Sequence, residues 1–255
     1  MNPIVTTTID PLLAILSFAF AVIGSFIALT AASRIRNAQG QLQFGNILDA
    51  GVALGGIGVW SMHFVGMLAL KMDIGSSYAA VETLLSLAAA IAATSFALRF
   101  AAKAPEKIGR LLIAGLFLGL SVVVMHYLGM YGLKISGYVQ WNHGLVALSI
   151  VIAVVAATAA LWLAFNSSTV GKRVAAAVIM GVAVCAMHYT GMLAAEFICT
   201  TDNRNAIPQG FGYIAGFDLP SLVIVVTVCI GIVLSVRQWF QVMNAQPIAS
   251  KLSSR

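Results

Sequence analysis

Long apolar runs alternate with short polar connections along the whole chain. A bilayer core about 30 Å thick is crossed by a helix of roughly twenty consecutive apolar residues. Seven runs are long enough, and they cover residues 12–33, 47–70, 79–100, 110–132, 145–165, 173–195 and 219–239. The pattern predicts an all-α integral membrane fold with seven transmembrane helices, in a domain of residues 1–240 that is followed by a tail of residues 241–255.

A six-residue motif, here called the hexad, recurs near the end of the second, fourth and sixth runs. Its copies are MHFVGM at residues 62–67, MHYLGM at 125–130 and MHYTGM at 187–192, so the histidines stand 63 and then 62 residues apart. This fixed period indicates three tandem helix-pair repeats with a seventh helix added. Repeats of this kind run parallel and predict a pseudo-threefold arrangement around an axis along the membrane normal.

Glycines precede each hexad at one fixed distance. Gly56, Gly119 and Gly181 stand seven residues before the histidine of their own copy. Small residues let the backbones of membrane helices approach closely. Close helix contacts are therefore expected two turns away from each histidine.

Composition supports a membrane protein and argues against a soluble catalytic domain within the chain. Hydrophobic residues make up 60% of the chain and charged residues 9%, against roughly 45–50% and about 25% in soluble domains. Because only short connections separate the seven runs, no soluble catalytic domain fits between them. The chain is therefore not expected to be an enzyme.

The basic residues fall mostly on one side of the predicted membrane domain. Eleven of the fourteen lie in loops or ends on that side, namely Arg34, Arg36, Arg99, Lys103, Lys107, Arg110, Lys172, Arg173, Arg237, Lys251 and Arg255. By the positive-inside rule this side is cytoplasmic. The N-terminus is then outside, the tail is cytoplasmic, and the net charge of +6 reflects topology rather than binding of nucleic acid.

The N-terminal run and the cysteines add little chemistry. Residues 1–11 carry no Lys or Arg, and the basic flank follows the first run, so this run is expected to be a retained helix rather than a signal peptide. The three cysteines, Cys185, Cys199 and Cys229, show no spacing that predicts a disulfide framework.

Charged residues after each hexad indicate the depth of the histidines. Lys71, Lys134 and Glu196 each stand eight residues after the histidine of their copy, which is about 12 Å along a helix. If these charges mark the outer interface, all three imidazoles lie in one layer in the outer half of the bilayer. One layer is what a shared site requires.

The second methionine of each hexad is expected to share a face with its histidine. Residues four apart lie about 40° apart around a helix. The predicted metal ligands are therefore His63 with Met67, His126 with Met130, and His188 with Met192. Weaker candidates as ligands or supporting residues are Met62, Met125, Met187, Cys185, Tyr127 and Tyr189.

Imidazole and thioether form a soft, neutral ligand set. Neutral ligands suit a membrane interior, where a buried charge is costly. Thioethers select Cu(I), and imidazole suits Cu, Zn and Fe. Copper is therefore the first metal expected on chemical grounds.

The hexad resembles the signature of the MHYT domain, a family of bacterial integral-membrane sensor domains named after the run that stands complete at residues 187–190. The resemblance extends from about residue 10 to about residue 240. It implies a sensor in the bacterial inner membrane that binds copper, with O2, CO or NO as candidate sensed gases. Redox state is an alternative signal for such a sensor. The resemblance also implies that such domains are often joined to cytoplasmic domains that make or degrade cyclic dinucleotides, or to kinases.

Other interpretations of the three histidines stay open at this point. A single membrane histidine often only bonds a neighbouring helix. His and Met are also axial ligands of haem, so a membrane haem protein is an alternative. Copper homeostasis or transport is another, although a permease is expected to carry ligands at several depths. The sequence ends at Arg255 without an output domain, so we expect signalling through a separate cytoplasmic partner.

Overall fold

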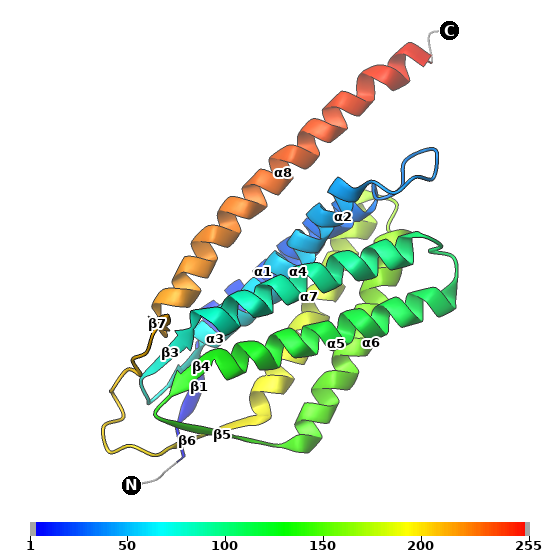
Figure 1. Cartoon of the computed structure of the whole chain (residues 1–255). Helices are drawn as coiled ribbons and strands as arrows, with labels where there is room; N and C mark the ends of the chain where they lie inside the picture. Colours follow the sequence, from blue (N-terminus) through cyan, green and yellow to red (C-terminus); the bar gives the residue numbers. More distant parts are fainter. Residues whose placement is uncertain (1–3, 253–255) are drawn as a thin grey trace.

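The computed structural model describes residues 4–252 (Figure 1). Within this part of the chain, seven helical segments are long and apolar enough to cross a membrane. They are α1 (Pro11–Ala32); the second span, made of α2 (Phe44–Gly51), η1 (Val52–Ser61) and α3 (Met62–Ala69); α4 (Ala80–Ala102); α5 (Ile108–Gly132); α6 (His143–Asn166); α7 (Val170–Leu193); and α8 (Asp218–Leu252). The predicted all-α membrane fold is confirmed.

Polar residues placed just before the apolar runs start several of these helices. The Asp10 carboxylate accepts hydrogen bonds from the backbone N–H groups of Leu12 and Leu13, and Asn142 and Thr169 cap α6 and α7 in the same way. Such caps satisfy donors that the first helical turn leaves free. α8 continues past its predicted end at residue 239 into the segment assigned as a tail.

Seven short strands, which were not predicted, gather at one end of the described helices. They are β1 (Thr7–Ile9), β2 (Leu70–Met72), β3 (Ser76–Ala79), β4 (Leu133–Ile135), β5 (Gly137–Trp141), β6 (Ala195–Cys199) and β7 (Tyr213–Ala215). Each has three to five residues and lies next to a helix, so alternation with a period of two is too brief to stand out in the sequence. This end is called the strand end below, and the opposite end is called the basic end.

The strands define the structural repeats. Each repeat runs strand, helix, helix, strand, and its two strands pair in antiparallel fashion: β1 with β2, β3 with β4, and β5 with β6. The repeats therefore cover residues 7–72, 76–135 and 137–199. β7 adds to the free side of β3 and leads into α8. The three predicted helix pairs and the added seventh helix are confirmed.

The hexad-bearing segments form the centre of the bundle. α1 packs against α7 and the second span, α4 against the second span and α5, and α6 against α5 and α7, so each of these three helices fills a groove between two central ones. α8 packs outside η1 and α3. The second span is therefore the most buried of the seven.

Glycines set the close helix contacts, with a shift in the first repeat. Gly119 faces the backbone of Val154 in α6, and Gly181 faces Val22 in α1, as predicted. In the first repeat the backbone contact is made by Gly55 against α4, whereas Gly56 meets only side chains. The prediction for Gly56 is wrong because η1 is a π-helix, which inserts extra backbone between this glycine and the hexad.

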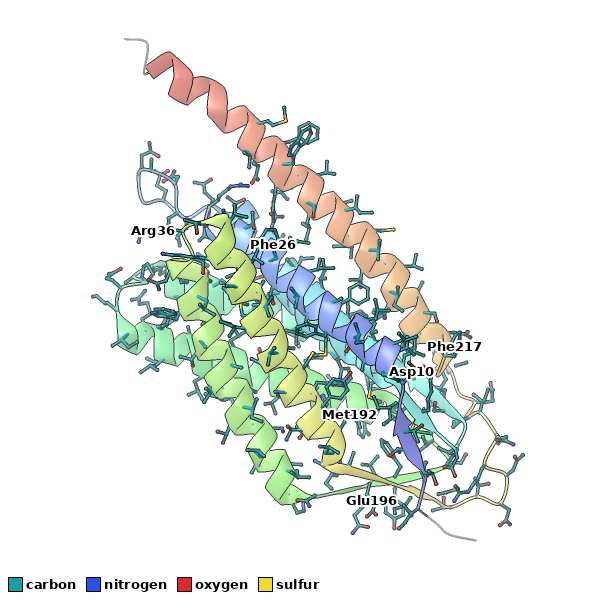
Figure 2. All side chains as sticks on the ribbon, turned by 180° about the vertical axis from the view of Figure 1, so that it is seen from behind. Asp10, Phe26, Arg36, Met192, Glu196 and Phe217 are labelled. Atoms are coloured by element: carbon teal, nitrogen blue, oxygen red, sulfur yellow. The ribbon has the colours of Figure 1, made fainter. Side chains whose placement is uncertain are left out.

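Polar contacts join α8 to α1 and α2 at the basic end. The Arg237 guanidinium donates to the buried carboxylate of Asp49 at 2.8 Å, and the Gln238 amide donates to the carbonyl of Ile27. Nearer the start of α8, the hydroxyls of Ser61 and Thr227 lie 2.6 Å apart. Figure 2 shows Asp10, Met192 and Glu196 toward the strand end and Arg36 at the basic end.

Replacing Gly119 with Ala should destabilise the bundle. The new Cβ would lie 2.5 Å from the Val154 Cα, so α5 and α6 must separate. Overpacking of this kind costs about 1–3 kcal/mol. Gly109→Ala on the same helix is the control, because a Cβ there meets nothing within 4 Å. Unfolding in detergent should show a loss for Gly119→Ala only; equal stability of the two variants would contradict the packing described here.

Candidate metal centre

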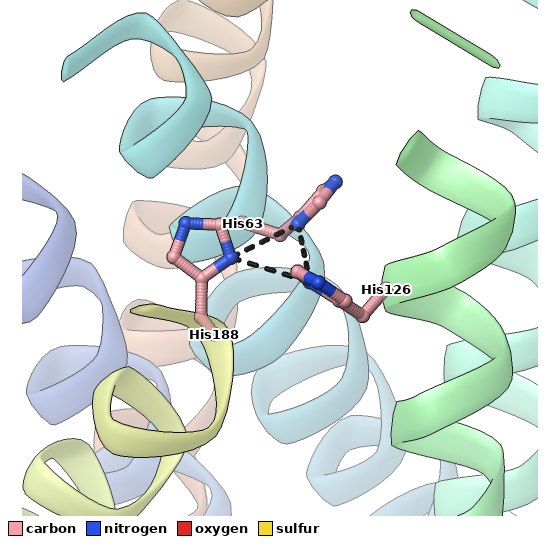
Figure 3. A group of neighbouring side chains, drawn as sticks. All are labelled: His63, His126 and His188. Carbon is pink, nitrogen blue, oxygen red and sulfur yellow. Dashed lines mark hydrogen bonds between the residues drawn. The ribbon is translucent and has the colours of Figure 1, made fainter. Parts of the chain in front are cut away.

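Three histidines from the three central segments meet in the interior of the bundle (Figure 3). His63 comes from α3, His126 from α5 and His188 from α7, and all three are 0% exposed. Their Nδ1 atoms converge: His63 to His188 is 3.2 Å, His63 to His126 is 3.2 Å, and His126 to His188 is 3.4 Å. The structure therefore brings the predicted histidines into one layer.

The glycine of each hexad makes room for the imidazole of another repeat. A Cβ at Gly129 would lie 2.5 Å from the Nε2 of His63. In the same way Gly191 faces the Nε2 of His126, and Gly66 faces the Nε2 of His188. Each ring therefore sits in a notch on the next central segment, and the contacts close a cycle around the pseudo-threefold axis.

The three Nδ1 atoms cannot all be satisfied by one another. In a neutral imidazole each ring nitrogen is either a donor or an acceptor. Of three nitrogens in mutual contact, at least two are then of the same kind, so at least one of the three contacts sets donor against donor or acceptor against acceptor. A cation between three acceptors removes this conflict, because every lone pair then points at positive charge.

The size of the triangle fits a metal ion. The point equidistant from three nitrogens 3.2, 3.2 and 3.4 Å apart lies about 1.9 Å from each, close to the roughly 2.0–2.1 Å of zinc–imidazole bonds. In the described part of the chain, these histidines are the only group of three or more His, Cys, Asp or Glu residues that could hold a metal. With Nδ1 as ligand, the proton resides on Nε2, which has no hydrogen-bond partner on any of the three rings.

The aromatic residue after each histidine packs edge-on against the imidazole. Ring centroids are 4.8 Å apart for His63 and Phe64, 4.8 Å for His126 and Tyr127, and 4.9 Å for His188 and Tyr189. The tyrosine hydroxyls bond to serines of the surrounding helices. Tyr127 lies 2.8 Å from the Ser149 hydroxyl, and Tyr189 lies 2.9 Å from that of Ser17.

The sequence analysis did not identify these serines as partners of the hexads. In the first repeat Phe64 has no hydroxyl, and Ser86 instead accepts from the Trp60 indole N–H at 3.0 Å. Ser17, Ser86 and Ser149 are all completely buried. Ser86 and Ser149 stand 63 residues apart, which is the repeat period, so this spacing could have identified these two serines but not Ser17.

The other predicted ligands lie close in sequence to the histidines. Met67, Met130 and Met192 are 3%, 2% and 8% exposed, and Met62, Met125 and Met187 are completely or almost completely buried. Cys185 is partly buried on α7 and is not part of the three-histidine group among the described residues. Roles for these sulfur atoms stay predictions.

A small apolar cavity lies one helical turn from the histidine layer, toward the basic end. Val59, Val122 and Val184, which each stand four residues before a histidine, line it together with Met187. Its volume is about 30 Å³. Small, apolar cavities of this kind stay dry and accept small apolar molecules.

Replacing Gly129 with Ala should disturb the centre. The new methyl group would occupy the notch that holds the His63 ring, 2.5 Å from its Nε2. Overpacking predicts a loss of about 1–3 kcal/mol in the free energy of unfolding. Gly132→Ala, where the nearest atom would be 3.4 Å away, serves as the control on the same helix. If both variants unfold alike, the glycine does not hold the imidazole in place.

Comparison with known proteins identifies the family. The family model described as "MHYT: Bacterial signalling protein N terminal repeat" matches residues 56–114, 119–177 and 181–246. No solved structure matches the chain. The matched segments begin in the central helices and are therefore offset from the structural repeats defined by the strands.

Three relatives are larger signalling proteins. The bifunctional diguanylate cyclase/cyclic di-GMP phosphodiesterase MucR of Pseudomonas aeruginosa is 39% identical over 186 residues, which cover 71% of this chain and 27% of MucR. The cyclic di-GMP phosphodiesterase NbdA of the same organism is 32% identical over 73% of this chain and 24% of its own length. The signaling protein YkoW of Bacillus subtilis is 30% identical over 74% of this chain and 24% of its own.

This chain therefore spans about a quarter of the length of these relatives. The three matched segments lie in the membrane bundle that carries the histidine centre. The chain belongs to the MHYT family and is a membrane-embedded sensor domain of the kind found in bacterial signalling proteins.

Proposed function

We propose that this protein is a membrane sensor that binds one metal ion through the Nδ1 atoms of His63, His126 and His188. The preferred metal is copper. The observation that carries the proposal is the triangle of Nδ1 atoms, with sides of 3.2 to 3.4 Å, whose contacts no choice of tautomers can satisfy. Three convergent, buried acceptors need a cation to be stable together.

The surroundings of the centre favour copper over harder metals. The three imidazole ligands are neutral, and the three-histidine group includes no carboxylate among the described residues. Met67, Met130 and Met192 each follow a histidine by one helical turn and are buried. Thioether sulfur selects Cu(I), whereas hard cations prefer oxygen ligands. Any of these methionines would serve as an additional ligand beside the three imidazoles.

Two features argue against the alternatives to a sensor with a bound ion. A haem needs a flat space for its macrocycle between two axial ligands. Here the helix backbone at Gly66, Gly129 and Gly191 lies directly against the imidazoles, and the adjoining cavity has a volume of only about 30 Å³. A copper permease is expected to have ligands at several depths. The described chain offers one three-histidine layer.

A sensor also needs a stimulus and an output. The apolar cavity beside the histidine layer suits a small uncharged molecule, which supports a diatomic gas such as O2, CO or NO as the stimulus. The hydrogen bond between Ser61 and Thr227 joins α8 to the segment that carries His63 two residues later. We infer that α8 transmits the state of the centre to a separate cytoplasmic partner.

Removing the histidines should remove the metal. The variant His63→Ala, His126→Ala, His188→Ala is compared with wild type and with His143→Ala, which changes the fourth histidine at the exposed start of α6. Purified protein is loaded with copper, washed, and analysed for copper per chain and for visible absorption.

Wild type and His143→Ala should each retain about one copper per chain, and the triple variant should retain none, because the three imidazoles are the ligands. Folding of the triple variant is checked by circular dichroism. Copper that persists in the folded triple variant, or a Soret band in place of copper, contradicts the proposal.

The orientation in the bacterial inner membrane is also a proposal. The positive-inside rule places the basic end in the cytoplasm. In a background without Cys185, Cys199 and Cys229, Asp202→Cys at the strand end should react with an impermeant maleimide on intact cells. Lys103→Cys, exposed at the basic end, should react only after lysis. The opposite pattern of labelling reverses the topology.

A further inference from the structure

Two arginines lie together at the basic end without an acidic partner. Arg34 follows α1, and Arg173 lies in the first turn of α7. The Arg173 guanidinium donates to the Ser33 hydroxyl at 3.1 Å. That of Arg34 donates to the Gln238 carbonyl and the Gln241 side-chain oxygen, both at 3.2 Å. All these acceptors are neutral, and neither arginine forms an ion pair within the described residues.

This arrangement is electrostatically unfavourable as it stands. Burial and the neighbouring charge of Arg173 lower the pKa of Arg34 from its ordinary value. The Nε of Arg173 is buried and has no hydrogen-bond partner. Asp49, a buried acid of the second span, is already bonded to Arg237. An anion between the two guanidinium groups would offset their repulsion and accept the free N–H.

An apolar groove begins at Val174, the residue after Arg173, and its wall contains neither arginine side chain. It has a volume of about 310 Å³ and lies between α1, α7 and α8. Val174, the residue after Arg173, and Ala177 line one wall, Phe26 and Ile27 line another, and Ser235 of α8 contributes to the third. Figure 2 shows Phe26 on α1, which passes between α7 and α8. A second groove of about 350 Å³ shares Ile27 and Ser235 and continues along α8.

We propose that this surface binds one anionic phospholipid, with the phosphate between Arg34 and Arg173 and an acyl chain along the groove. Basic pockets between membrane helices are suited to lipid headgroups of this kind. The groove distinguishes a lipid from free phosphate, because an inorganic anion would leave the apolar walls unused. A zwitterionic lipid is disfavoured, since its cationic group would approach the same two arginines.

Other basic residues of this end lack these features and provide a control. Lys103 is exposed just after α4, and Lys107 is the exposed residue that precedes α5. Arg173 directly precedes Val174 of the groove wall, whereas neither lysine adjoins a residue that lines one of the main pockets of the described structure. The double variant Lys103→Gln, Lys107→Gln therefore removes the same charge as Arg34→Gln, Arg173→Gln without touching the proposed site.

The test uses native mass spectrometry to measure how many lipid molecules the full chain retains when it is released from detergent. The detergent contains either phosphatidylglycerol or phosphatidylcholine. Wild type should retain one phosphatidylglycerol per chain, and the lysine variant should do the same. Loss of two interacting arginines should weaken binding roughly tenfold or more, given about 1 kcal/mol for each basic residue at a lipid surface. Val174→Trp, which fills the groove and keeps both arginines, should also lose the lipid.

Three outcomes would overturn the lipid site. The first is equal retention of phosphatidylcholine and phosphatidylglycerol by wild type, and the second is equal retention of phosphatidylglycerol by the two double variants. In a third arm, millimolar inorganic phosphate must fail to displace phosphatidylglycerol from wild type; displacement would indicate a simple anion site. Circular dichroism confirms folding of every variant. Copper retention should be unchanged throughout, because the lipid site is separate from the histidine centre and does not depend on it.

Discussion

Three completely buried imidazoles, with Nδ1 atoms that cannot satisfy one another, are the constraint on which this structure depends. Buried polar atoms without partners are costly, and here three Nδ1 and three Nε2 atoms share one layer. The layer exists because Gly66, Gly129 and Gly191 let each ring press against the backbone of the next repeat. A larger side chain at any of these positions would push a ring out of the cycle.

The first repeat departs from the threefold pattern in ways that suit transmission of a signal. Its central segment contains the π-helix η1 directly before the hexad, and α8 covers this segment from outside. π-helical turns are uncommon and often occur at functional sites. Ser61 ends η1 and contacts Thr227, and Asp49 holds Arg237 at the basic end. A change at His63 therefore has a direct structural route to α8.

Much of this was predictable because the membrane imposes simple rules on sequence. Spans of about twenty apolar residues and a repeat near 62 residues predicted seven helices in three pairs, and equal distances to Lys71, Lys134 and Glu196 predicted one histidine layer. The π-helix was not predictable, since no residue pattern marks it, and it moved the close contact from Gly56 to Gly55. Which imidazole nitrogen faces the axis depends on ring rotation, which spacing does not reveal.

The most direct test of the central claim is X-ray absorption at the metal edge of the copper-loaded protein. Three imidazole nitrogens at about 1.9–2.0 Å are expected from the size of the Nδ1 triangle and from ordinary metal–imidazole distances. A longer sulfur ligand from a hexad methionine would be compatible with this account. A first shell dominated by sulfur, or one with fewer than three imidazoles, would contradict it.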